Sequence, residues 1–431
     1  MSRVSFYTLG CKLNYAETGT LERQFEEREF SIVPFGEAAD VTVVNTCSVT
    51  AEADRKCRNV IRRAQRANPH AFIIVTGCYA QLRPAEIAAI EGVDVVLGAH
   101  EKFRLFQLIE EFSKREQPQL LVSCIDEVSE YGPASSSAGR TRAFLKIQDG
   151  CDYSCSFCTI PMARGKSRSQ GLESTLAEAR SLADRGFHEI VLSGVNIGLY
   201  GEDSGTSLLD LLKELDRIDG IDRYRISSIE PNLLSDEIID FVAESIRFQP
   251  HYHIPLQSGD DFVLGKMRRR YRRAVYADRV DRIKHLMPHA GIGADVIVGF
   301  PSEDRGCFDN SYRFINELPL SYLHVFTYSE RAGTAAAETD GVLPPERTRR
   351  NRMLRVLSRK KEEAFYREHL GTTRPVLWEK GATEDTVRGY TDNYIKVDAP
   401  RDFHRRGQIE PVLLGSLSDR GTVLAGFFSL G

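Results

Sequence analysis

The sequence lacks any long apolar run. Nowhere do about eighteen consecutive apolar residues occur, the length that a helix needs to cross a bilayer. The opening residues MSRVSFYTLGCKLNYAETG contain no apolar segment of signal-peptide length either. These two absences argue against an integral membrane protein and predict a cytoplasmic protein with no membrane partner.

Cysteine is also scarce, with nine residues in 431, and the count is odd. A disulfide framework needs an even number of densely spaced cysteines, and a reducing cytoplasm disfavours disulfides altogether. Cysteines of an intracellular protein more often bind metal or take part in catalysis. Their positions are therefore the first guide to chemistry.

The hydrophobic pattern predicts an α/β protein of three domains and a linker, because 431 residues exceed one ordinary core. Residues 1–125 alternate apolar runs with amphipathic stretches, which predicts a small parallel sheet of three or four strands. Residues 126–141 are rich in Ser and Gly and have no periodicity, so we expect a linker. Residues 142–371 contain six further strand–helix rounds, which predicts an open (β/α)6 partial barrel rather than a closed one. Residues 372–431 have short strands separated by turn residues, typical of a small all-β barrel.

Three cysteines crowd into the stretch GCDYSCSFC, at Cys151, Cys155 and Cys158. Their C-x3-C-x2-C spacing offers three ligands, and no fourth ligand at customary spacing follows, so a structural zinc site is disfavoured. Three thiolates can hold three irons of a [4Fe-4S] cluster and leave the fourth iron open. The alternative is three buried structural thiols.

This stretch resembles the cluster motif of the radical S-adenosylmethionine (SAM) enzymes. The resemblance implies that Cys151, Cys155 and Cys158 are catalytic, because they hold a cluster whose open iron binds SAM. One electron from that cluster then cleaves SAM to methionine and a 5'-deoxyadenosyl radical. By the same resemblance Phe157 lies beside the adenine of SAM, although an aromatic residue here could equally be core.

A second trio of cysteines follows three strand candidates directly, in TLGCKLN, VVNTCSV and VTGCYAQ. Because the carboxyl ends of parallel strands share one edge of a sheet, we expect Cys11, Cys47 and Cys78 to converge there. That convergence is what a second three-thiolate cluster requires; unrelated buried cysteines are the alternative. Cys57, Cys124 and Cys307 match neither pattern, and we expect them to pack as small apolar residues.

The order of these motifs resembles the methylthiotransferase family over essentially the whole chain. GCKLN, NTCSVT and GCYAQ precede CDYSCSFC, and SGVNIGLYG, HIPLQSGDDFVLGKMRRRY, DVIVGFPSED and a TRAM-like terminal barrel follow. The resemblance implies two [4Fe-4S] clusters, SAM as methyl donor and radical source, and an electron donor such as a flavodoxin-type reductant. In that family a methylthio group replaces a hydrogen on an unactivated carbon.

Polar residues after successive strands are candidate SAM contacts. By resemblance, the SGVN loop contacts the methionine part of SAM and Glu230 and Gln257 reach its ribose. The full set of candidates is Ser193, Gly194, Asn196, Ser228, Glu230, Gln257 and Asp295. Polar residues also cap strands without any function. His251 and His253 share one strand face, where satisfied structural histidines are more common than a metal pair.

Net charge is –4, so binding to RNA has to rest on local basic patches. Residues 55–66 place Arg55, Arg58, Arg62 and Arg66 on one helical face. Residues 266–273 contain six basic residues in eight, with Tyr271 available for stacking. Residues 346–374 carry ten basic and four acidic residues in one expected helix. Tyr390, Tyr394 and Phe403 in the terminal barrel are further candidates for holding bases of an RNA loop.

The TLGCKLNYAET stretch resembles the branch of the family that acts on N6-threonylcarbamoyladenosine next to the tRNA anticodon. The same chemistry on isopentenyladenosine tRNA or on a ribosomal-protein aspartate is the first alternative. A non-catalytic RNA-binding iron-sulfur protein is an alternative of a different class, and it would form no 5'-deoxyadenosine. A zinc-binding interaction module is the weakest interpretation, because neither trio has a fourth ligand.

Overall fold

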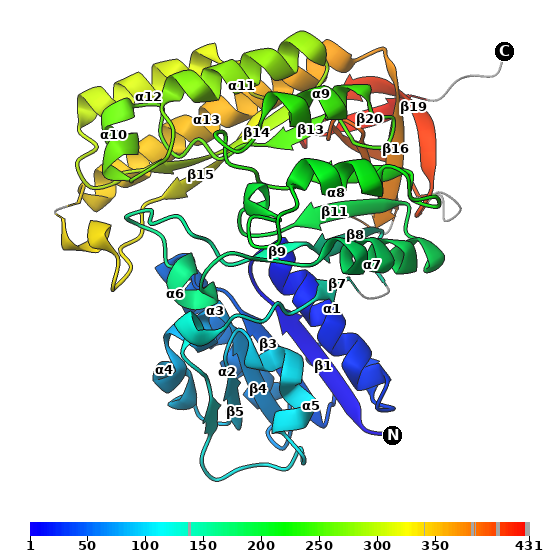
Figure 1. The fold of residues 1–431 in the computed structure, drawn as a ribbon, viewed down its shortest axis with the longest axis vertical. Coiled ribbons are helices and arrows are strands. Elements are labelled where there is room, and N and C mark those ends of the chain that lie inside the picture. Colours follow the sequence, from blue (N-terminus) through cyan, green and yellow to red (C-terminus); the bar gives the residue numbers. More distant parts are fainter. Residues whose placement is uncertain (137–138, 340, 381–382, 384, 402–405, 427–431) are drawn as a thin grey trace. The chain divides into compact units, whose positions relative to one another are not determined.

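The computed structural model describes residues 1–431 except 137–138, 340, 381–382, 384, 402–405 and 427–431 (Figure 1). The chain forms two compact units, which are described separately. The first unit consists of Met1–Thr175, Ser193–Ser207 and Ser329–Ala337. The second unit consists of Leu176–Leu192, Leu208–Tyr328 and Glu338–Gly431.

The first unit is built on a parallel sheet of six strands, two more than the upper number that the sequence predicted. The strand order is β2-β1-β3-β4-β5-β6. The strands are β1 (Arg3–Thr8), β2 (Ser31–Val33), β3 (Val41–Thr46), β4 (Phe72–Gly77), β5 (Val95–Leu97) and β6 (Gln119–Leu121). The two additional edge strands are three residues long, too short for a clear hydrophobic pattern. Every residue of β3 and β4 is buried, as expected for central parallel strands covered on both faces.

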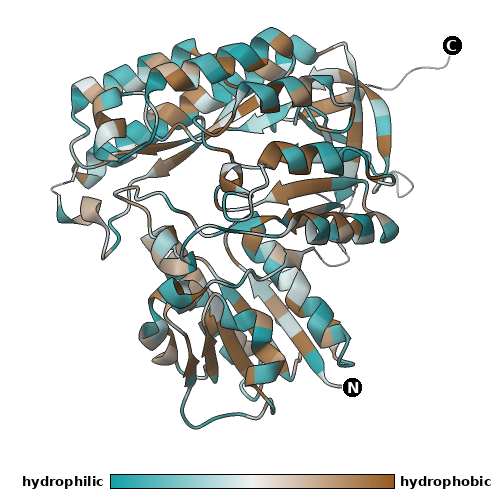
Figure 2. Cartoon of the chain, in the orientation of Figure 1, coloured by the Kyte–Doolittle hydropathy of each residue, from teal (hydrophilic) through white to brown (hydrophobic). Residues whose placement is uncertain are grey.

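Helices cover both faces of this sheet. They are α1 (Lys12–Glu26), α2 (Ala51–Ala67), α3 (Cys78–Leu82), α4 (Pro84–Ala88) and α5 (Leu105–Leu108), with a 3-10 turn η1 (Glu101–Arg104). On one face Cys57, Ile61 and Ala64 of α2 pack in one cluster with Val44, Ile73 and Val75. On the other face Leu21 and Phe25 of α1 pack with Val43 and Ile74. Figure 2 shows brown apolar strands beside helices with mixed faces.

Residues 126–141, expected to be a linker, are partly ordered against α1. The segment contains most of η2 (Ile125–Glu127) and the strand β7 (Ala134–Ser135), which pairs antiparallel with β8 (Arg142–Lys146). Ser135 and Ser136 are fully buried, and both carbonyls accept hydrogen bonds of 3.0 Å from the Arg23 guanidinium. The composition predicted a linker, but these two carbonyls accept hydrogen bonds from one arginine that is distant in sequence. Ser137 and Ala138 lie outside the described residues.

The rest of the first unit carries the cysteine-rich loop. β9 (Gln148–Asp149) and β10 (Arg168–Ser169) form an antiparallel ribbon, and α6 (Ile160–Arg164) lies between them in sequence. The 3-10 turn η3 (Ile197–Leu199) follows the SGVN loop. Hydrogen bonds fix the ribbon against this turn, because Ser169 Oγ accepts from the Gly201 N–H at 2.9 Å.

The second unit contains the other parallel strands of the expected partial barrel. They are β11 (Glu189–Ser193), β12 (Arg223–Ile226), β13 (His251–His253), β14 (Gly291–Val298) and β15 (Tyr322–Thr327). Parallel pairing joins β11 to β12 and β13 to β14 to β15, and single bridges such as Ser228 to His253 connect the two groups. With β8, the chain therefore has the six strands that the sequence predicted. Helices alternate with them: α7 (Leu172–Asp184), α8 (Leu208–Leu215), α9 (Asp236–Glu244), α10 (Asp261–Lys266), α11 (Arg273–Leu286), α12 (Arg305–Glu317) and α13 (Pro344–His369). The 3-10 turn η4 (Ala335–Glu338) belongs to the first unit except for its last residue.

A closed five-stranded barrel completes the second unit, as predicted, with strand order β16-β17-β18-β20-β19. Its strands are β16 (Thr373–Lys380), β17 (Thr386–Thr391), β18 (Lys396–Pro400), β19 (Ile409–Leu417) and β20 (Val423–Gly426). Trp378 is fully buried in its core, and its indole N–H donates to Glu410 at 2.7 Å. Arg225 of β12 donates to the carbonyls of Thr391 and Asp392, which ties this barrel to the strands beside it.

Candidate active site

The trio of Cys11, Cys47 and Cys78 lies at the carboxyl edge of the six-stranded sheet, as the sequence predicted. Cys11 is the N-cap of α1, Cys47 directly follows β3, and Cys78 directly follows β4 as the first residue of α3. Gly10 has a left-handed φ of 103°, and a Cβ there would lie 2.7 Å from the Cβ of Cys47. Only glycine allows the Cys11 loop to come this close to Cys47.

The three thiols of this trio influence one another electrostatically. Burial raises the pKa of Cys47 to about 12, and negative charge on Cys78 and Cys11 adds to that rise. Burial also raises the pKa of Cys78, and negative charge on Cys11 acts in the same direction, whereas the positive charge of Arg164 lowers it. Neighbouring buried thiolates need a positive partner, and metal binding supplies one while it releases the protons. The donor set therefore fits an iron-sulfur cluster.

The trio of Cys151, Cys155 and Cys158 lies on the loop between β9 and α6. The backbone N–H groups of Tyr153 and Ile160 donate to the sulfurs of Cys151 and Cys158 at 3.4 and 3.5 Å. Such N–H to sulfur contacts stabilise the negative charge of thiolate ligands and tune the reduction potential of a cluster. The Cys158 N–H donates to the Cys155 carbonyl at 3.1 Å, which curls the chain between these two ligands.

Neither trio is arranged around a single metal ion. In the described part of the chain, the one group that brings three ligand atoms of His, Cys, Asp or Glu within 4.8 Å of one another is His253, Asp295 and His324. A tetrahedral zinc ion would draw its sulfur ligands to about 4 Å of one another. The wider spacing of the cysteines fits a polynuclear cluster.

The SGVN loop is connected to the cysteine loop through Gln148, a residue that the sequence analysis missed. The Gln148 amide donates to the Gly150 carbonyl at 2.8 Å and accepts from the Asn196 N–H at 2.9 Å. A Cβ at Gly194 would lie 2.9 Å from the same Gln148 oxygen. Ser193 is fully buried at the end of β11. Ser193, Gly194 and Asn196 therefore lie on one loop that is held by Gln148, three residues before Cys151.

Asn196 has the features of a ligand contact. Its side chain is 4% exposed, and neither its amide nitrogen nor its amide oxygen has a hydrogen-bond partner among the described residues. An unpartnered buried amide is costly unless a bound molecule satisfies it. The α-amino and α-carboxylate groups of an amino acid offer one donor group and one acceptor group, so this residue fits the methionine part of SAM.

Asn196→Ala is expected to weaken SAM binding by roughly 10- to 100-fold, because hydrogen bonds to charged groups contribute about 1.5–3 kcal/mol. Folding should be unaffected, since the side chain makes no hydrogen bond within the described chain. Calorimetric titration of SAM into the cluster-loaded protein measures the effect, with the exposed Asn59→Ala as the matched control. Equal affinity of the two variants would contradict this assignment.

The other candidate SAM contacts belong to the second unit. Ser228 and Glu230 follow β12, and Glu230 forms an ion pair with Arg269; burial raises the pKa of Glu230 while Arg269 lowers it. Gln257 has a left-handed φ of 63°, a strained conformation for a residue with a Cβ. Asp295 lies within β14, three residues before its end, and not after the strand as the sequence analysis expected. The contact of these four residues with SAM stays a prediction.

Each histidine of β13 has a hydrogen-bond partner within the protein. His251 pairs with the Tyr322 hydroxyl at 2.9 Å and stacks on Tyr394 with ring centroids 4.2 Å apart. His253 pairs with Asp295 at 2.9 Å, and His324 reaches the same carboxylate oxygen at 3.2 Å. Burial raises the pKa of Asp295, but the two histidines overcome that effect and hold it well below its usual range. One carboxylate oxygen of Asp295 is thus hydrogen-bonded to both His253 and His324.

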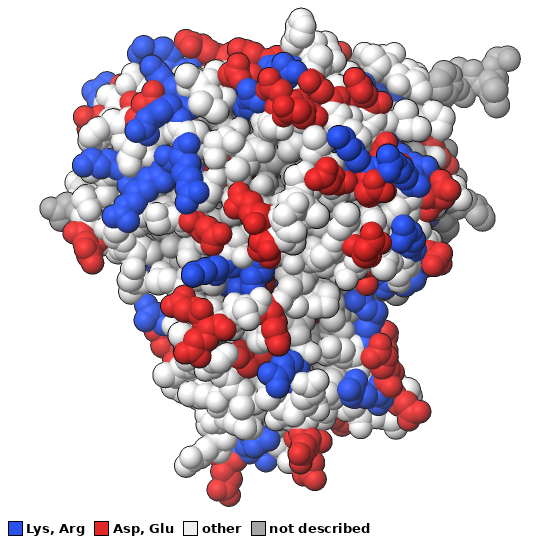
Figure 3. Space-filling model, in the orientation of Figure 1, with Lys and Arg blue, Asp and Glu red and all other residues white. Residues whose placement is uncertain are grey.

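All three predicted basic patches present cations to solvent; in residues 266–273 the exposed ones are Lys266, Arg268, Arg270, Arg272 and Arg273. Arg55, Arg62 and Arg66 of α2 are exposed, while Arg58 is half-buried and donates to the Tyr79 hydroxyl at 2.7 Å. On α13, Arg350 is buried against Glu303, and the exposed basic residues are Arg349, Arg352, Arg355, Arg359, Lys360 and Arg367. Figure 3 shows Lys and Arg side chains gathered at the upper left of this face, the region of α10 to α13 in Figure 1.

Of the predicted stacking residues, Tyr271 is buried, and Tyr390 and Tyr394 are half-buried. Tyr271 is 3% exposed and its hydroxyl donates to the Pro255 and Leu256 carbonyls, so the expectation that it stacks on RNA is wrong. Arg269 is also buried, which removes it from the patch. Tyr390 and Tyr394 stack on each other with centroids 4.8 Å apart. Phe403 lies outside the described residues.

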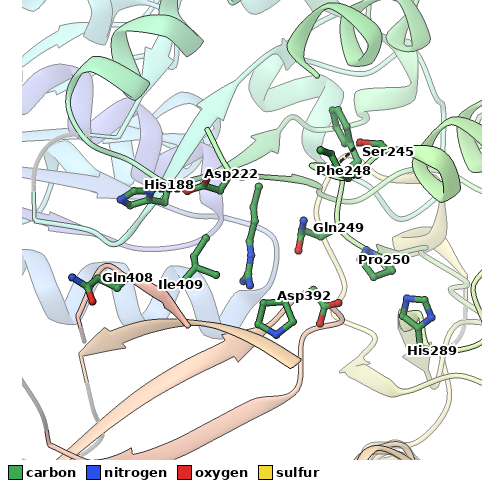
Figure 4. Close-up of a pocket in the computed structure, with 13 residues that line it drawn as sticks. His188, Asp222, Ser245, Phe248, Gln249, Pro250, His289, Asp392, Gln408 and Ile409 are labelled. Atoms are coloured by element: carbon green, nitrogen blue, oxygen red, sulfur yellow. Dashed lines mark hydrogen bonds and ion pairs between the residues drawn. The ribbon is translucent and has the colours of Figure 1, made fainter. Parts of the chain in front are cut away.

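A cavity of about 780 Å³ in the second unit lies at the amino ends of the parallel strands β11, β12 and β13 (Figure 4). His188, Asp222 and Pro250 immediately precede β11, β12 and β13. In folds of this kind catalytic groups gather at the carboxyl ends. This cavity is therefore not the place where the sequence and fold predict chemistry.

The two cysteine trios and the alternating strands define a radical SAM enzyme with an added N-terminal cluster domain. The Radical SAM superfamily matches residues 145–315, and uncharacterized protein family UPF0004 matches residues 3–98. The fold is similar to that of the radical SAM methyltransferase TsrM from Kitasatospora setae, with a TM-score of 0.56 and 16% identity over 78% of this chain and 77% of that one.

Similar proteins place the chain in one family of radical SAM enzymes. The threonylcarbamoyladenosine tRNA methylthiotransferase MtaB of Bacillus subtilis (strain 168) is 42% identical over 407 residues, 92% of this chain and 90% of the relative. That of Aquifex aeolicus (strain VF5) is 38% identical over 96% of this chain and all of the relative. The tRNA-2-methylthio-N(6)-dimethylallyladenosine synthase of Desulfitobacterium hafniense (strain Y51) is 31% identical over 94% and 93%. The chain belongs to the radical SAM methylthiotransferase family, whose enzymes use SAM and two [4Fe-4S] clusters.

No helix that the structure describes combines the length and the apolar character that a membrane crossing requires.

Proposed function

We propose that this protein is a tRNA methylthiotransferase that converts N6-threonylcarbamoyladenosine next to the anticodon into its 2-methylthio derivative. The observation that carries the proposal is identity over nearly the whole chain: 42% and 38% to two relatives named for this nucleoside, against 31% to one named for dimethylallyladenosine. The GCKLN motif at Cys11 agrees with this branch. The protein works in the cytoplasm and takes electrons from a flavodoxin-type donor.

The six cysteines divide into two sites in this proposal. Cys151, Cys155 and Cys158 hold the cluster that binds SAM, and Cys11, Cys47 and Cys78 hold the auxiliary cluster. When bound, these cofactors supply the electron, the methyl group and the sulfur of the reaction. Phe157 is half-buried within the cysteine loop and lines the adenine position.

The chain's own residues orient SAM and exclude water. Asn196, held by Gln148, receives the methionine part of SAM, and Ser193 and Gly194 form the wall beside it. Gln148 fixes both loops at once, so SAM is presented in one orientation relative to the cysteines. Glu230 and Gln257 serve the ribose, with Ser228 and Asp295 completing the set of polar groups.

Local cations bring the anionic tRNA to this acidic protein. Arg55, Arg62 and Arg66 protrude from the outer face of α2, where they can neutralise three phosphates. Replacing all three by alanine is expected to weaken tRNA binding roughly tenfold and to reduce the salt dependence, with a slope of log K against log[salt] lower by about 2–3. Filter binding from low to moderate salt measures both.

A matched control removes the same charge elsewhere in the first unit. Arg3, Arg104 and Arg115 are exposed, and their alanine variant should bind tRNA like the wild type. If both triple variants lose affinity equally, α2 has no special role and only the net charge matters.

Mass spectrometry of tRNA nucleosides from cells with and without the gene tests the function. We expect 2-methylthio-N6-threonylcarbamoyladenosine to disappear and its unthiolated precursor to accumulate. Loss of the isopentenyl analogue or of a ribosomal-protein methylthioaspartate instead would assign the enzyme to another branch. Persistence of all three marks would favour a non-catalytic RNA-binding iron-sulfur protein.

A further inference from the structure

Five ionisable side chains are buried together in the first unit. Glu17, Lys102, Lys146, Asp149 and Arg164 all have side chains at most 8% exposed. Arg164 donates to Glu17 at 2.8 Å and to Asp149 at 2.9 Å, and Lys146 reaches Asp149 at 2.6 Å. Lys102 pairs with Glu17. Ion pairs on a protein surface contribute little to stability, whereas removing one partner of a buried network leaves an uncompensated charge and is costly.

The network joins the two cysteine motifs. Arg164 lies six residues after Cys158, and its second nitrogen donates to the Asn14 oxygen at 2.8 Å. Asn14, three residues after Cys11, donates in turn to the carbonyls of Leu9 and Thr46 at 2.7 and 3.0 Å. Thr46 directly precedes Cys47. One guanidinium therefore fixes the loops that carry Cys11 and Cys47.

The other side of the same guanidinium faces the SAM cysteines. Asp149 accepts from Arg164 and from the Gly150 N–H at 2.9 Å, and Gly150 directly precedes Cys151. Arg164 is the last residue of α6, which follows Cys158. The fork geometry of arginine suits this bridging between several acceptors, whereas lysine would act as a point charge.

The buried charges do not balance among themselves. Lys102, Lys146 and Arg164 are three cations against the two carboxylates of Glu17 and Asp149, and Arg168 adds a further cation 4.0 Å from Asp149. A buried excess of positive charge is unfavourable without a counter-charge. The auxiliary cysteines can supply it, because the Cys11 sulfur lies 4.0 Å from the same Asn14 oxygen that accepts the hydrogen bond from Arg164.

We propose that Arg164 is a positioning residue that fixes the auxiliary cysteine trio relative to the SAM cysteine loop and raises the reduction potential of the auxiliary cluster. The inference rests on the proposed function, which assigns Cys11, Cys47 and Cys78 to that cluster. Positive charge beside a cluster favours its reduced, more negative state. Arg164 acts through its hydrogen bonds to Asn14 and Asp149 and through its positive charge beside the Cys11 loop.

A redox titration of the reconstituted holoenzyme followed by electron paramagnetic resonance tests this role. Signals of the two clusters are separated because SAM addition shifts the spectrum of the cluster that binds it. In Arg164→Gln we expect the equilibrium constant for reduction of the auxiliary cluster to fall at least tenfold, which lowers its reduction potential by about 59 mV for one electron. The variant should retain about eight iron atoms. Arg164→Lys keeps the charge and should restore most of the potential.

A second variant covers the case in which Arg164→Gln does not fold. Lys102→Met removes one buried cation of the same network and leaves Glu17 paired with Lys146 and Arg164, so a smaller shift in the same direction is expected. Arg55→Gln, which removes an exposed cation, is the control and should leave both potentials unchanged. An unchanged auxiliary potential in Lys102→Met and in any folded Arg164→Gln protein would overturn the inference.

The wild-type protein separates this inference from the proposed function. If the wild type has two clusters and methylthiolation activity, but replacing Arg164 leaves the reduction potentials unchanged, only the inference is overturned. A wild type that binds a single cluster would overturn both.

Discussion

Replacing Cys151, Cys155 and Cys158 together by alanine is expected to abolish 5'-deoxyadenosine formation and tRNA methylthiolation. The protein should retain about four of its eight iron atoms, because the auxiliary trio is untouched. The physical reason is that the proposed function assigns SAM binding to the open iron of a cluster held by these three thiolates. Two of the sulfurs already accept backbone N–H groups, from Tyr153 and Ile160, which prepares them as negatively charged ligands.

Iron analysis and chromatography of SAM cleavage products check this prediction on one reconstituted sample. The matched control is Cys124→Ala with Cys307→Ala, two cysteines outside both trios. That control should keep about eight irons and full activity. If instead the control loses iron to the same extent, the assignment of the trio fails.

Replacing Cys11, Cys47 and Cys78 together should separate the two halves of the reaction. We expect 5'-deoxyadenosine formation to persist with SAM and reductant, about four irons to remain, and methylthiolated nucleoside to fall below detection. These cysteines lie at the carboxyl edge of a different sheet from the SAM cysteine loop. Mutating them removes the sulfur source and leaves the thiolates of the SAM site in place.

The quantity that decides this second prediction is the ratio of 5'-deoxyadenosine to methylthiolated nucleoside. Wild-type protein should form both, and the triple variant only the first. Loss of SAM cleavage together with methylthiolation, in a variant whose thermal unfolding is normal, would show that the two trios do not form separate sites.

The cysteine sites could be predicted because their signal is local in sequence. C-x3-C-x2-C is a spacing on one loop, and Cys11, Cys47 and Cys78 each follow a buried apolar strand. Parallel topology then brings strand ends to one edge without any further information. The closed barrel at residues 373–426 was predictable for a similar reason, since alternating strands and turn residues recur at short intervals.

What could not be predicted depends on contacts between distant residues. Gln148 accepts a hydrogen bond from Asn196, 48 positions away, and Arg164 donates one to Asn14, 150 positions away. No local sequence pattern predicts either hydrogen bond. Tyr271 lies in a strongly basic stretch, yet its own ring is apolar enough to be buried and its hydroxyl finds two carbonyls. Residues 126–141 were predicted to be a linker for the same reason, because their composition does not reveal that Arg23 binds the carbonyls of Ser135 and Ser136.

The most direct test of the central claim is a reaction of purified, reconstituted protein with an anticodon stem-loop that bears N6-threonylcarbamoyladenosine. SAM and reductant are added, and the nucleosides are analysed by mass spectrometry beside an otherwise identical stem-loop that bears isopentenyladenosine. The account predicts the 2-methylthio product on the threonylcarbamoyl stem-loop and little or none on the other. Methylthiolation of the isopentenyl stem-loop alone, or of neither while 5'-deoxyadenosine still forms, would contradict it.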